Sequence, residues 1–311
     1  MSSEPLLAVD KGVGSLSTLL VKEPPRTAVT EADAFAFCRR MARTQYENFT
    51  VVSWFLPKHL QPYMFAIYGF CRQVDDLGDE ATDDRLALLD RWEEDLERAY
   101  HGAPNHPVMV ALQATVRKFD IPIEPFKKLI TANRLDQQHQ TWATYDDLLH
   151  YCDHSANPVG RLVLYVFGYR DEERQRLSDA TCTALQLTNF WQDVKRDLNK
   201  GRIYLPLADM ARFGYSAEEL KRGVENDAFV RLMAFEVDRA RHLFHEGLRL
   251  IPSVDGKLRL DLKLFTLGGM KILDAIEREH YHVLERRPHL SKAQKTRLVL
   301  GTYLKMKLGL A

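Results

Sequence analysis

Apolar residues recur every three or four positions along most of the chain after residue 30, which is the spacing of one face of a helix. The clearest case is TDDRLALLDRWEEDLERAYHG (82–102), where acidic residues stand at the start and Gly102 follows the end. Its apolar positions form one stripe: Leu86, Leu89, Trp92, Leu96 and Tyr100. This pattern predicts an amphipathic helix.

Further segments show the same helical spacing, and Pro or Gly separates them. The predicted helices are 125–138, 144–155, 179–198, 227–250 and 265–287. The breaks include HGAPNHP (101–107), DIPIEP (120–125) and IPSVDG (251–256). Sustained alternation of apolar and polar residues, which would indicate strands, is hard to find, and no repeat of fixed length is visible. We therefore predict an all-α fold rather than a solenoid.

The expected domain begins near Thr30. Residues 1–29 are mixed in character and contain a Pro-Pro pair close to their end, so we expect a flexible N-terminal leader there and one helical domain over 30–311. Thr30 and Asp33 resemble a capping box, although the usual partner is Glu or Gln, and the apolar run AFAFC follows at once.

Composition and charge narrow the class of protein. The 311 residues are 45% hydrophobic and 28% charged, as in an ordinary soluble globular protein. Lys+Arg and Asp+Glu both number 43, so nucleic acid, which attracts basic proteins, is not expected as a partner. Four widely spaced cysteines fit reduced thiols. With neither a secretory signal nor a membrane-spanning run, we expect the cytoplasm.

Two groups of acidic residues interrupt this even distribution of charge. The first, in QVDDLGDE, puts Asp75 and Asp79 on one helix face and Asp76 on the adjoining face. The second, in WQDVKRDLNKG, puts Asp193 and Asp197 on one face, where like charges repel by roughly a few tenths of a kcal/mol. The leading residues are 193 − 75 = 118 positions apart, which leaves room for the two groups to face each other across a bundle.

The neighbouring residues indicate what these acids bind. Apolar residues flank both groups, so we do not expect the carboxylates to be fully solvated. Basic residues lie within a few positions: Arg72, Lys195, Arg196, Lys200 and Arg202. Mg²⁺ prefers one or two carboxylates together with waters and phosphate oxygens, so the mixture fits a magnesium and diphosphate site. A solvated surface of salt bridges uses the same residue types and remains an alternative.

Three strings taken together resemble a known family. They are YGFCRQVDDLGDE (68–80), YCDHSANPVGRL (151–162) and QLTNFWQDVKRDLNKGRIYLP (186–206). Their order and spacing are similar to those of the squalene and phytoene synthases, all-helical enzymes that join prenyl diphosphates head to head. The resemblance covers roughly residues 30–300.

Within that family the chain is most similar to the hopanoid-associated bacterial branch, squalene synthase HpnC, through YENF (46–49), SANPVGR (155–161) and GGMKIL (268–273). Members of that branch convert presqualene diphosphate to hydroxysqualene. The resemblance implies the isoprenoid-synthase fold, a helical bundle around a central cavity, and a Mg²⁺-dependent prenyl diphosphate transferase or lyase in which water captures the rearranged cation.

Two other functions stay open at this point. One is condensation of two farnesyl diphosphates to presqualene diphosphate or squalene. The other is a non-catalytic binding or assembly protein, since a fold by itself does not determine a function. The family substrates are greasy, which is compatible with contact at the inner face of the membrane and with other enzymes of the pathway.

The resemblance also implies roles for individual residues. The expected Mg²⁺ ligands are Asp75, Asp76, Asp79, Asp193 and Asp197. The expected catalytic residues are Tyr68, Arg72, Tyr151 and Asn189. The expected substrate-binding residues are Asn48, Phe49, Ser53, Arg72, Gln186, Asn189, Arg202, Tyr204, Arg286 and Lys292. Candidates for directing the capturing water are Asn48, Asn189 and Tyr151.

Two positions depart from the family pattern. Many relatives have a Ser-x-Ser-Phe string where this chain has YENF, and many have a cavity tyrosine where this chain has Gly269. Both changes are expected to alter the cavity wall, and both fit the hydroxysqualene branch.

The C-terminal stretch RRPHLSKAQKTRLVLGTYLKMKLGLA (286–311) mixes basic and apolar residues. This composition fits a helix lying on an anionic membrane surface. From the sequence we favour the other interpretation, an ordinary terminal helix packed on the core.

Overall fold

The computed structural model describes residues 29–44, 56–79, 81 and 84–308, and the structural statements that follow concern those residues. The expected leader, apart from Val29, lies outside them. Within these ranges the secondary structure is helical, with one isolated bridge between Thr141 and Ile203 in place of any strand. The prediction of an all-α fold is confirmed.

The N-terminal half of the molecule packs around one hydrophobic cluster. Its helices are α2 (Glu31–Thr44), α4 (Gln61–Asp79), α5 (Arg85–His101), α6 (Pro107–Phe119) and α7 (Glu124–Gln138). Phe70 of α4 lies at the centre, with its ring centroid 5.8 Å from that of Trp92 and 5.0 Å from that of Phe126. All three rings are fully buried, so they hold α4, α5 and α7 together.

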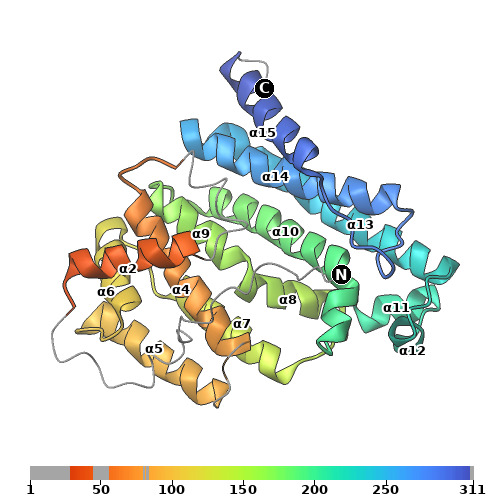
Figure 1. Ribbon diagram of the computed structural model, residues 1–311, viewed down its shortest axis with the longest axis horizontal. Helices are drawn as coiled ribbons and strands as arrows, with labels where there is room; N and C mark the ends of the chain where they lie inside the picture. The colour runs from red at the N-terminus through yellow and green to blue at the C-terminus, as the bar shows by residue number, and fades with distance from the viewer. Residues whose placement is uncertain (1–28, 45–55, 80, 82–83, 309–311) are drawn as a thin grey trace, which may run out of the picture.

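The C-terminal half packs around α10, as Figure 1 shows. The helices of this half are α8 (Tyr145–Ser155), α9 (Asn157–Val166), α10 (Glu172–Asn199), α11 (Leu207–Phe213), α12 (Ala217–Lys221), α13 (Asp227–Gly247), the 3₁₀-helix η1 (Leu248–Ser253), α14 (Gly256–Arg278) and α15 (Lys292–Lys307). Helices α8 and α9 lie on one side of α10, and α13 and α14 lie on the other. The fully buried Trp191, Phe229 and Phe244 belong to this second cluster.

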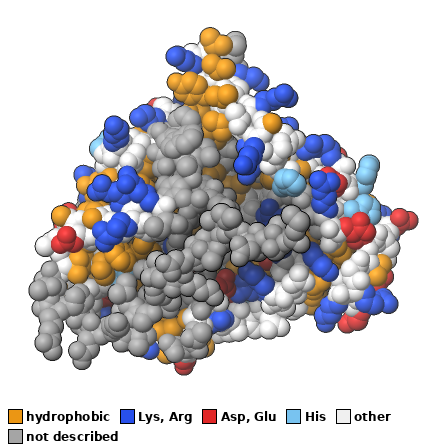
Figure 2. All heavy atoms as spheres, viewed as in Figure 1, with side chains coloured by type: hydrophobic (Ala, Val, Ile, Leu, Met, Phe, Trp, Pro, Cys, Tyr) orange, Lys and Arg blue, Asp and Glu red, His pale blue; other side chains and the backbone are white. Residues whose placement is uncertain are grey.

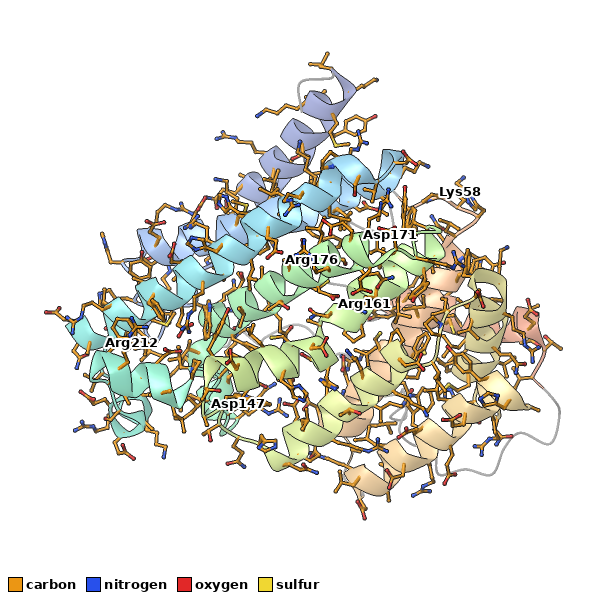
Figure 3. The ribbon with its side chains drawn as sticks, turned by 180° about the vertical axis from the view of Figure 1, so that it is seen from behind. Lys58, Asp147, Arg161, Asp171, Arg176 and Arg212 are labelled. Carbon is orange, nitrogen blue, oxygen red and sulfur yellow. The ribbon has the colours of Figure 1, made fainter. Side chains whose placement is uncertain are left out.

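Polar contacts fix the position of α10. Its N-cap residue Asp171 accepts a hydrogen bond from the backbone N–H of Arg174 at 3.1 Å. Arg161 of α9 donates from Nε to Oδ1 of Asp179 at 3.0 Å, and the view from behind shows Arg161 between the two helices (Figure 3). The helix is interrupted at Asp193, whose φ of −108° and ψ of 15° lie outside the helical region.

Most predicted elements are confirmed, and several details differ: the helix expected at 179–198 starts at Glu172, and the one expected at 227–250 ends at Gly247. The helix expected within 82–102 is α5, capped by Asp84 and ended by Gly102, but Leu86 of its predicted apolar stripe is 42% exposed. The helix expected at 265–287 starts earlier and ends at Arg278. It ends there because His280 and Tyr281 adopt left-handed backbone angles, with φ of 52° and 65°, which turn the chain back toward α10.

Two smaller predictions also agree with the structure. The Asp33 N–H donates to Thr30 Oγ1 at 3.2 Å, and the Thr30 hydroxyl donates to the Asp33 carboxylate at 2.6 Å, so α2 begins as expected. The cysteines are free thiols, either buried or half-buried.

The last helix differs from our favoured expectation. Helix α15 projects from the body of the molecule (Figure 1), and Thr302 is the one residue buried on it. Its inner side packs on α14, whereas much of its outer side is open to solvent. The expectation of an ordinary core helix is therefore wrong for the outer side. Within the described ranges, no helix combines the length and the apolar run needed to cross a bilayer.

Candidate functional site

A cavity of about 290 Å³ opens where the two halves of the molecule meet. Side chains of α4, α7, α8 and α10 line it, together with the segment that follows α10. The first acidic group and the residues after the second one thus reach the same space. Asp75 and Asp79 line this cavity and are also exposed to solvent, and Asp79 pairs with Arg202 there.

Helix α4 presents its two acidic faces in different directions. Asp75 and Asp79 line the cavity, whereas Asp76 is buried and forms an ion pair with Arg72 one turn earlier. Tyr68 lies one further turn back and is half-buried against the N-terminal cluster. Of the three expected ligands on this helix, the structure brings two into the cavity and turns Asp76 toward Arg72.

A glycine allows α7 to approach this acidic turn closely. A Cβ atom at Gly78 would lie 2.2 Å from Oδ1 of Asn133 and 3.2 Å from its Cβ. Gln137 of α7 donates to the Gly78 carbonyl at 2.8 Å. Asn133 also acts on the Asp75 carboxyl, in the direction that lowers its pKa. That carboxyl is crowded by protein atoms yet remains in contact with water, and the crowding raises its pKa to about 7.

The segment after α10 carries the second acidic group to the first. The Arg202 N–H donates to the carbonyl of Asp197 at 2.9 Å across the turn at Gly201, where φ is 80°. Next along the chain, the Ile203 N–H donates to the carbonyl of Gln140 at 2.8 Å. This anchoring directs Arg202 into the cavity, where its Nη2 lies 2.7 Å from Oδ1 of Asp79.

Asp197 lies beside this contact. Burial and, after it, the negative charge of Asp193 raise the pKa of its carboxyl to about 6, although Lys200 and Arg202 act in the opposite direction. The charge of Asp136 also acts on Asp197, so three carboxylates from α7 and α10 share one electrostatic environment. A cation placed there would relieve their repulsion.

Asp193 is held by an arginine that the sequence did not single out. Arg287 binds its carboxylate with two bonds, Nε to Oδ1 at 2.6 Å and Nη2 to Oδ2 at 2.8 Å. The preceding Gln192 donates to the carbonyl of Pro288 at 2.5 Å, which fixes the segment against the interruption in α10. By contrast, Arg286 and Lys292 are exposed and form no ion pair with any described residue. The turn at 280–281 determines which arginine points inward.

Asp136 is a second site residue that sequence reasoning missed. Tyr151 of α8 donates its hydroxyl to Oδ2 of Asp136 at 2.8 Å, and both side chains line the cavity. Burial raises the pKa of the Asp136 carboxyl and of the Tyr151 hydroxyl. Asp136 stands alone in RLDQQHQ, outside either acidic group, so only its i,i+3 relation to Asn133 could have indicated a shared face.

Aromatic rings form one wall of the cavity. Tyr204 stacks on Phe190 of α10 with centroids 3.8 Å apart and planes at 7°, and Tyr151 lies 6.0 Å from Tyr204. Gln186 lines the cavity one turn before Asn189, which is exposed on the same face of α10. The expected residues Asn48, Phe49 and Ser53 lie outside the described residues.

Gly269 lies where three helices pack closely together. A Cβ atom there would lie 2.3 Å from Cζ of Phe244 and 2.9 Å from Cδ2 of Leu185. Those two side chains already fill the space, and Gly269 does not line the cavity described above. A glycine here lets α14 approach α10, and the expectation that this position reshapes the wall of a substrate cavity stays a prediction.

The donors present fit Mg²⁺ bound together with a substrate. Within the described residues, no three acidic, His or Cys side chains gather closely enough to hold a metal by themselves. Asp75 and Asp79 instead line the cavity, and Asp197 lines an adjoining pocket together with Arg202 and Tyr204, which line both. Mg²⁺ keeps several waters or phosphate oxygens and needs few protein ligands, so this set suits it.

The chain is similar in sequence to squalene and phytoene synthases. A family model described as squalene/phytoene synthase matches residues 42–294. The chain is 31% identical to a 15-cis-phytoene synthase of Synechococcus elongatus, over 89% of this chain and 94% of that protein. It is 33% identical to a phytoene synthase of Arthrospira platensis, over 87% of this chain and 92% of that protein.

Solved structures have the same fold. The crystal structure of squalene synthase HpnC from Alicyclobacillus acidocaldarius is 51% identical, with a TM-score of 0.80, and the match covers 82% of this chain and 97% of that one. A dehydrosqualene synthase in complex with a ligand is 28% identical, with a TM-score of 0.81, and the match covers 89% of this chain and 98% of that one.

Proposed function

We propose, since the chain belongs to the squalene/phytoene synthase family, that it ionises presqualene diphosphate with the help of Mg²⁺ and captures the rearranged cation with water to give hydroxysqualene. The observation that carries the proposal is the 2.7 Å contact between Asp79 and Arg202, which come from the two motifs and meet in one cavity. The 51% identity to an HpnC squalene synthase, against 31–33% to phytoene synthases, supports this branch.

The charged side of the cavity would bind the diphosphate. Asp75, Asp79 and Asp197 would hold Mg²⁺, which supplies Lewis-acid charge to the leaving group when bound. Arg202 would turn from Asp79 to the diphosphate once the cation balances the carboxylate. Because such donors act most strongly as charge develops on the leaving oxygens, removing one costs on the order of 10²–10³ in rate.

The aromatic side would accommodate the cation. The C–O bond breaks with its electron pair going to the diphosphate, the carbon skeleton rearranges, and the oxygen of a water adds to the cation and releases one proton. Tyr151 and Tyr204 present ring faces worth about 0.5–2 kcal/mol each by cation–π contact. Asp136 holds the Tyr151 hydroxyl in place, so Tyr151 can orient the attacking water.

A second candidate is head-to-head condensation of two farnesyl diphosphates to presqualene diphosphate or squalene. Similarity to phytoene synthases over nearly nine-tenths of the chain favours it. A non-catalytic binding protein is a weaker candidate, because the chain retains all five motif aspartates.

Offering the substrates separately distinguishes these functions. Purified protein with Mg²⁺ should convert presqualene diphosphate into a C30 alcohol and free diphosphate, detected by mass spectrometry. Intact presqualene diphosphate at the end of the incubation would contradict the proposal. Formation of presqualene diphosphate or squalene from farnesyl diphosphate alone would identify the condensation reaction instead.

An active-site variant tests the assignment of the cavity. Asp79→Asn is expected to lower turnover by about 10²–10³-fold while the helical circular dichroism stays unchanged, because it removes a charge that faces the substrate. The matched control is Asp146→Asn, an exposed carboxylate in the first turn of α8 outside the cavity. Equal activity of the two variants would disprove the role of Asp79.

A further inference from the structure

The segment between α14 and α15, residues 279–291, carries Arg287 to the second acidic group without a helix of its own. Figure 2 shows histidine side chains among basic and acidic ones at the right of the molecule, the side on which Figure 1 places α11 and α12. Within the segment, Val283 and Leu284 are buried, whereas Arg286 is exposed. Since the backbone here belongs to no regular element, particular contacts must determine where Arg287 lies.

Glu225, in the loop between α12 and α13, binds the middle of this segment. Its Oε1 accepts a hydrogen bond from the backbone N–H of Leu284 at 2.7 Å, and its Oε2 lies 3.1 Å from Nδ1 of His282. The side chain of Glu225 is 6% exposed, so water cannot readily replace these partners and their loss would be costly. One buried carboxylate thus anchors a piece of chain that lies 59 positions further along the sequence.

The loop that carries Glu225 is itself fixed on both sides of that residue. Before it, the buried Tyr215 donates its hydroxyl to the carbonyl of Val224 at 2.7 Å. After it, Asn226 caps α13 by accepting a hydrogen bond from the Phe229 N–H at 3.0 Å. The Glu225 carboxylate therefore projects from backbone that cannot easily shift.

A second anchor holds the far end of the segment. Gln192 of α10 donates to the carbonyl of Pro288 at 2.5 Å and accepts from Nη2 of Arg287 at 3.2 Å. Arg287 lies between the two anchors and places its two bonds on Asp193, at 2.6 and 2.8 Å, where α10 is interrupted. The anchors at Glu225 and Gln192 together set the course of the chain that ends in this ion pair.

We propose that Glu225 is a positioning residue, which holds the segment so that Arg287 orients Asp193 at the diphosphate site. The charge of Asp193 acts on Asp197, which lines a pocket together with Arg202. Without the Glu225 anchor, Arg287 would no longer be held over Asp193, and the carboxylates that suit Mg²⁺ would lose their fixed arrangement. The inference rests on the diphosphate site of the proposed function, and it does not depend on which product forms.

Binding of inorganic diphosphate in the presence of Mg²⁺, measured on the full chain by isothermal titration calorimetry, tests this role without any turnover. Glu225→Ala should weaken binding by about 10–100-fold, because partners that orient metal-binding groups typically contribute that much. Glu225→Gln should lose less affinity than Glu225→Ala, since its amide oxygen can still accept from the Leu284 N–H.

A double-mutant cycle separates positioning from a loss of stability. In a chain that already carries Arg287→Ala, adding Glu225→Ala should weaken diphosphate binding by less than about two-fold, because the effect of Glu225 passes through Arg287. A role of Glu225 in the fold alone would instead cause the same loss in both backgrounds.

The matched control is Asn226→Ala, which removes the cap of α13 beside Glu225 and lowers the melting temperature but leaves both anchors of the segment. Its diphosphate binding should stay within about two-fold of the unaltered protein. Unchanged binding by Glu225→Ala, equal losses in both backgrounds, an equal loss in Asn226→Ala, or no Mg²⁺-dependent binding by the unaltered protein would each overturn the proposal. If the expected binding results appear while presqualene diphosphate stays intact, only the proposed product is wrong.

Discussion

Asp136 acquires its role from residues that are distant in sequence. Tyr151 donates to it from α8, and the charges of Arg202 and Asp79 act on it across the cavity. Its Oδ1 is buried and has no hydrogen-bond partner among the described residues, so the carboxylate depends on its Tyr151 contact and on the nearby arginine. Such a group orients a neighbouring side chain rather than stabilising the fold.

Asp136→Asn is expected to lower kcat by about 10–100-fold with little change in KM, because partners that orient active groups typically contribute that much. Steady-state kinetics on presqualene diphosphate provide the measurement, with thermal melting to check folding. Asp153→Asn serves as control, since that carboxylate of α8 pairs with Lys128 of α7 away from the cavity. If both variants keep normal kinetics, Asp136 has no part in catalysis.

At the scale of the elements, α10 determines the geometry of the site. Its regular path is interrupted at Asp193, and its neighbours approach it closely where their residues are small. Gly269 of α14 faces α10 and α13 with no spare room, whereas the adjacent Gly268 has only Leu298 within reach, at 3.9 Å. Gly269 therefore has no space for a side chain, whereas Gly268 has space for one.

Gly269→Ala is expected to lower the free energy of unfolding by about 1–3 kcal/mol, because the added methyl group overlaps the buried ring of Phe244. Gly268→Ala should leave stability equal or raise it by up to about 1 kcal/mol, since alanine favours the helix and meets open space. Urea denaturation of the pair measures both effects. A destabilisation of equal size in the two variants would show that close packing at Gly269 is not the cause.

At the scale of the whole molecule, a carboxylate far from the cavity links stability to pH. Glu236 of α13 is 0% exposed, and burial raises its pKa from 4.5 to about 8 even though Arg239 acts in the opposite direction. Between those values the folded chain keeps a proton that the unfolded chain has released. Stability is therefore expected to fall as pH rises across this window.

Glu236→Gln should remove that contribution. Each pKa unit corresponds to about 1.4 kcal/mol, so the decline in unfolding free energy between about pH 5 and pH 8 should be at least about 1 kcal/mol smaller in the variant. Urea titrations at several pH values measure the difference. Glu218→Gln, on the exposed side of α12, controls for the loss of one carboxylate. Parallel pH profiles for Glu236→Gln and the unaltered protein would contradict the assignment.

The sequence by itself determined the features that depend on residues a few positions apart. The spacing of Leu89, Trp92 and Leu96 predicted α5, and the spacing of Asp75 and Asp79 predicted that they share a face, because a helix repeats every 3.6 residues. The combination of motifs also indicated the family. None of these inferences required knowledge of which helices touch.

Only the tertiary structure decided the contacts between distant segments. It selected Arg287 rather than Arg286 as the partner of Asp193, added Asp136 to the cavity, and left Leu300, Leu304 and Leu308 of α15 exposed. Each outcome depends on how helices pack and where turns such as 280–281 reverse the chain. Helix packing depends on the sum of many weak contacts between residues that are far apart in sequence. No local pattern of hydrophobic and polar positions encodes that sum.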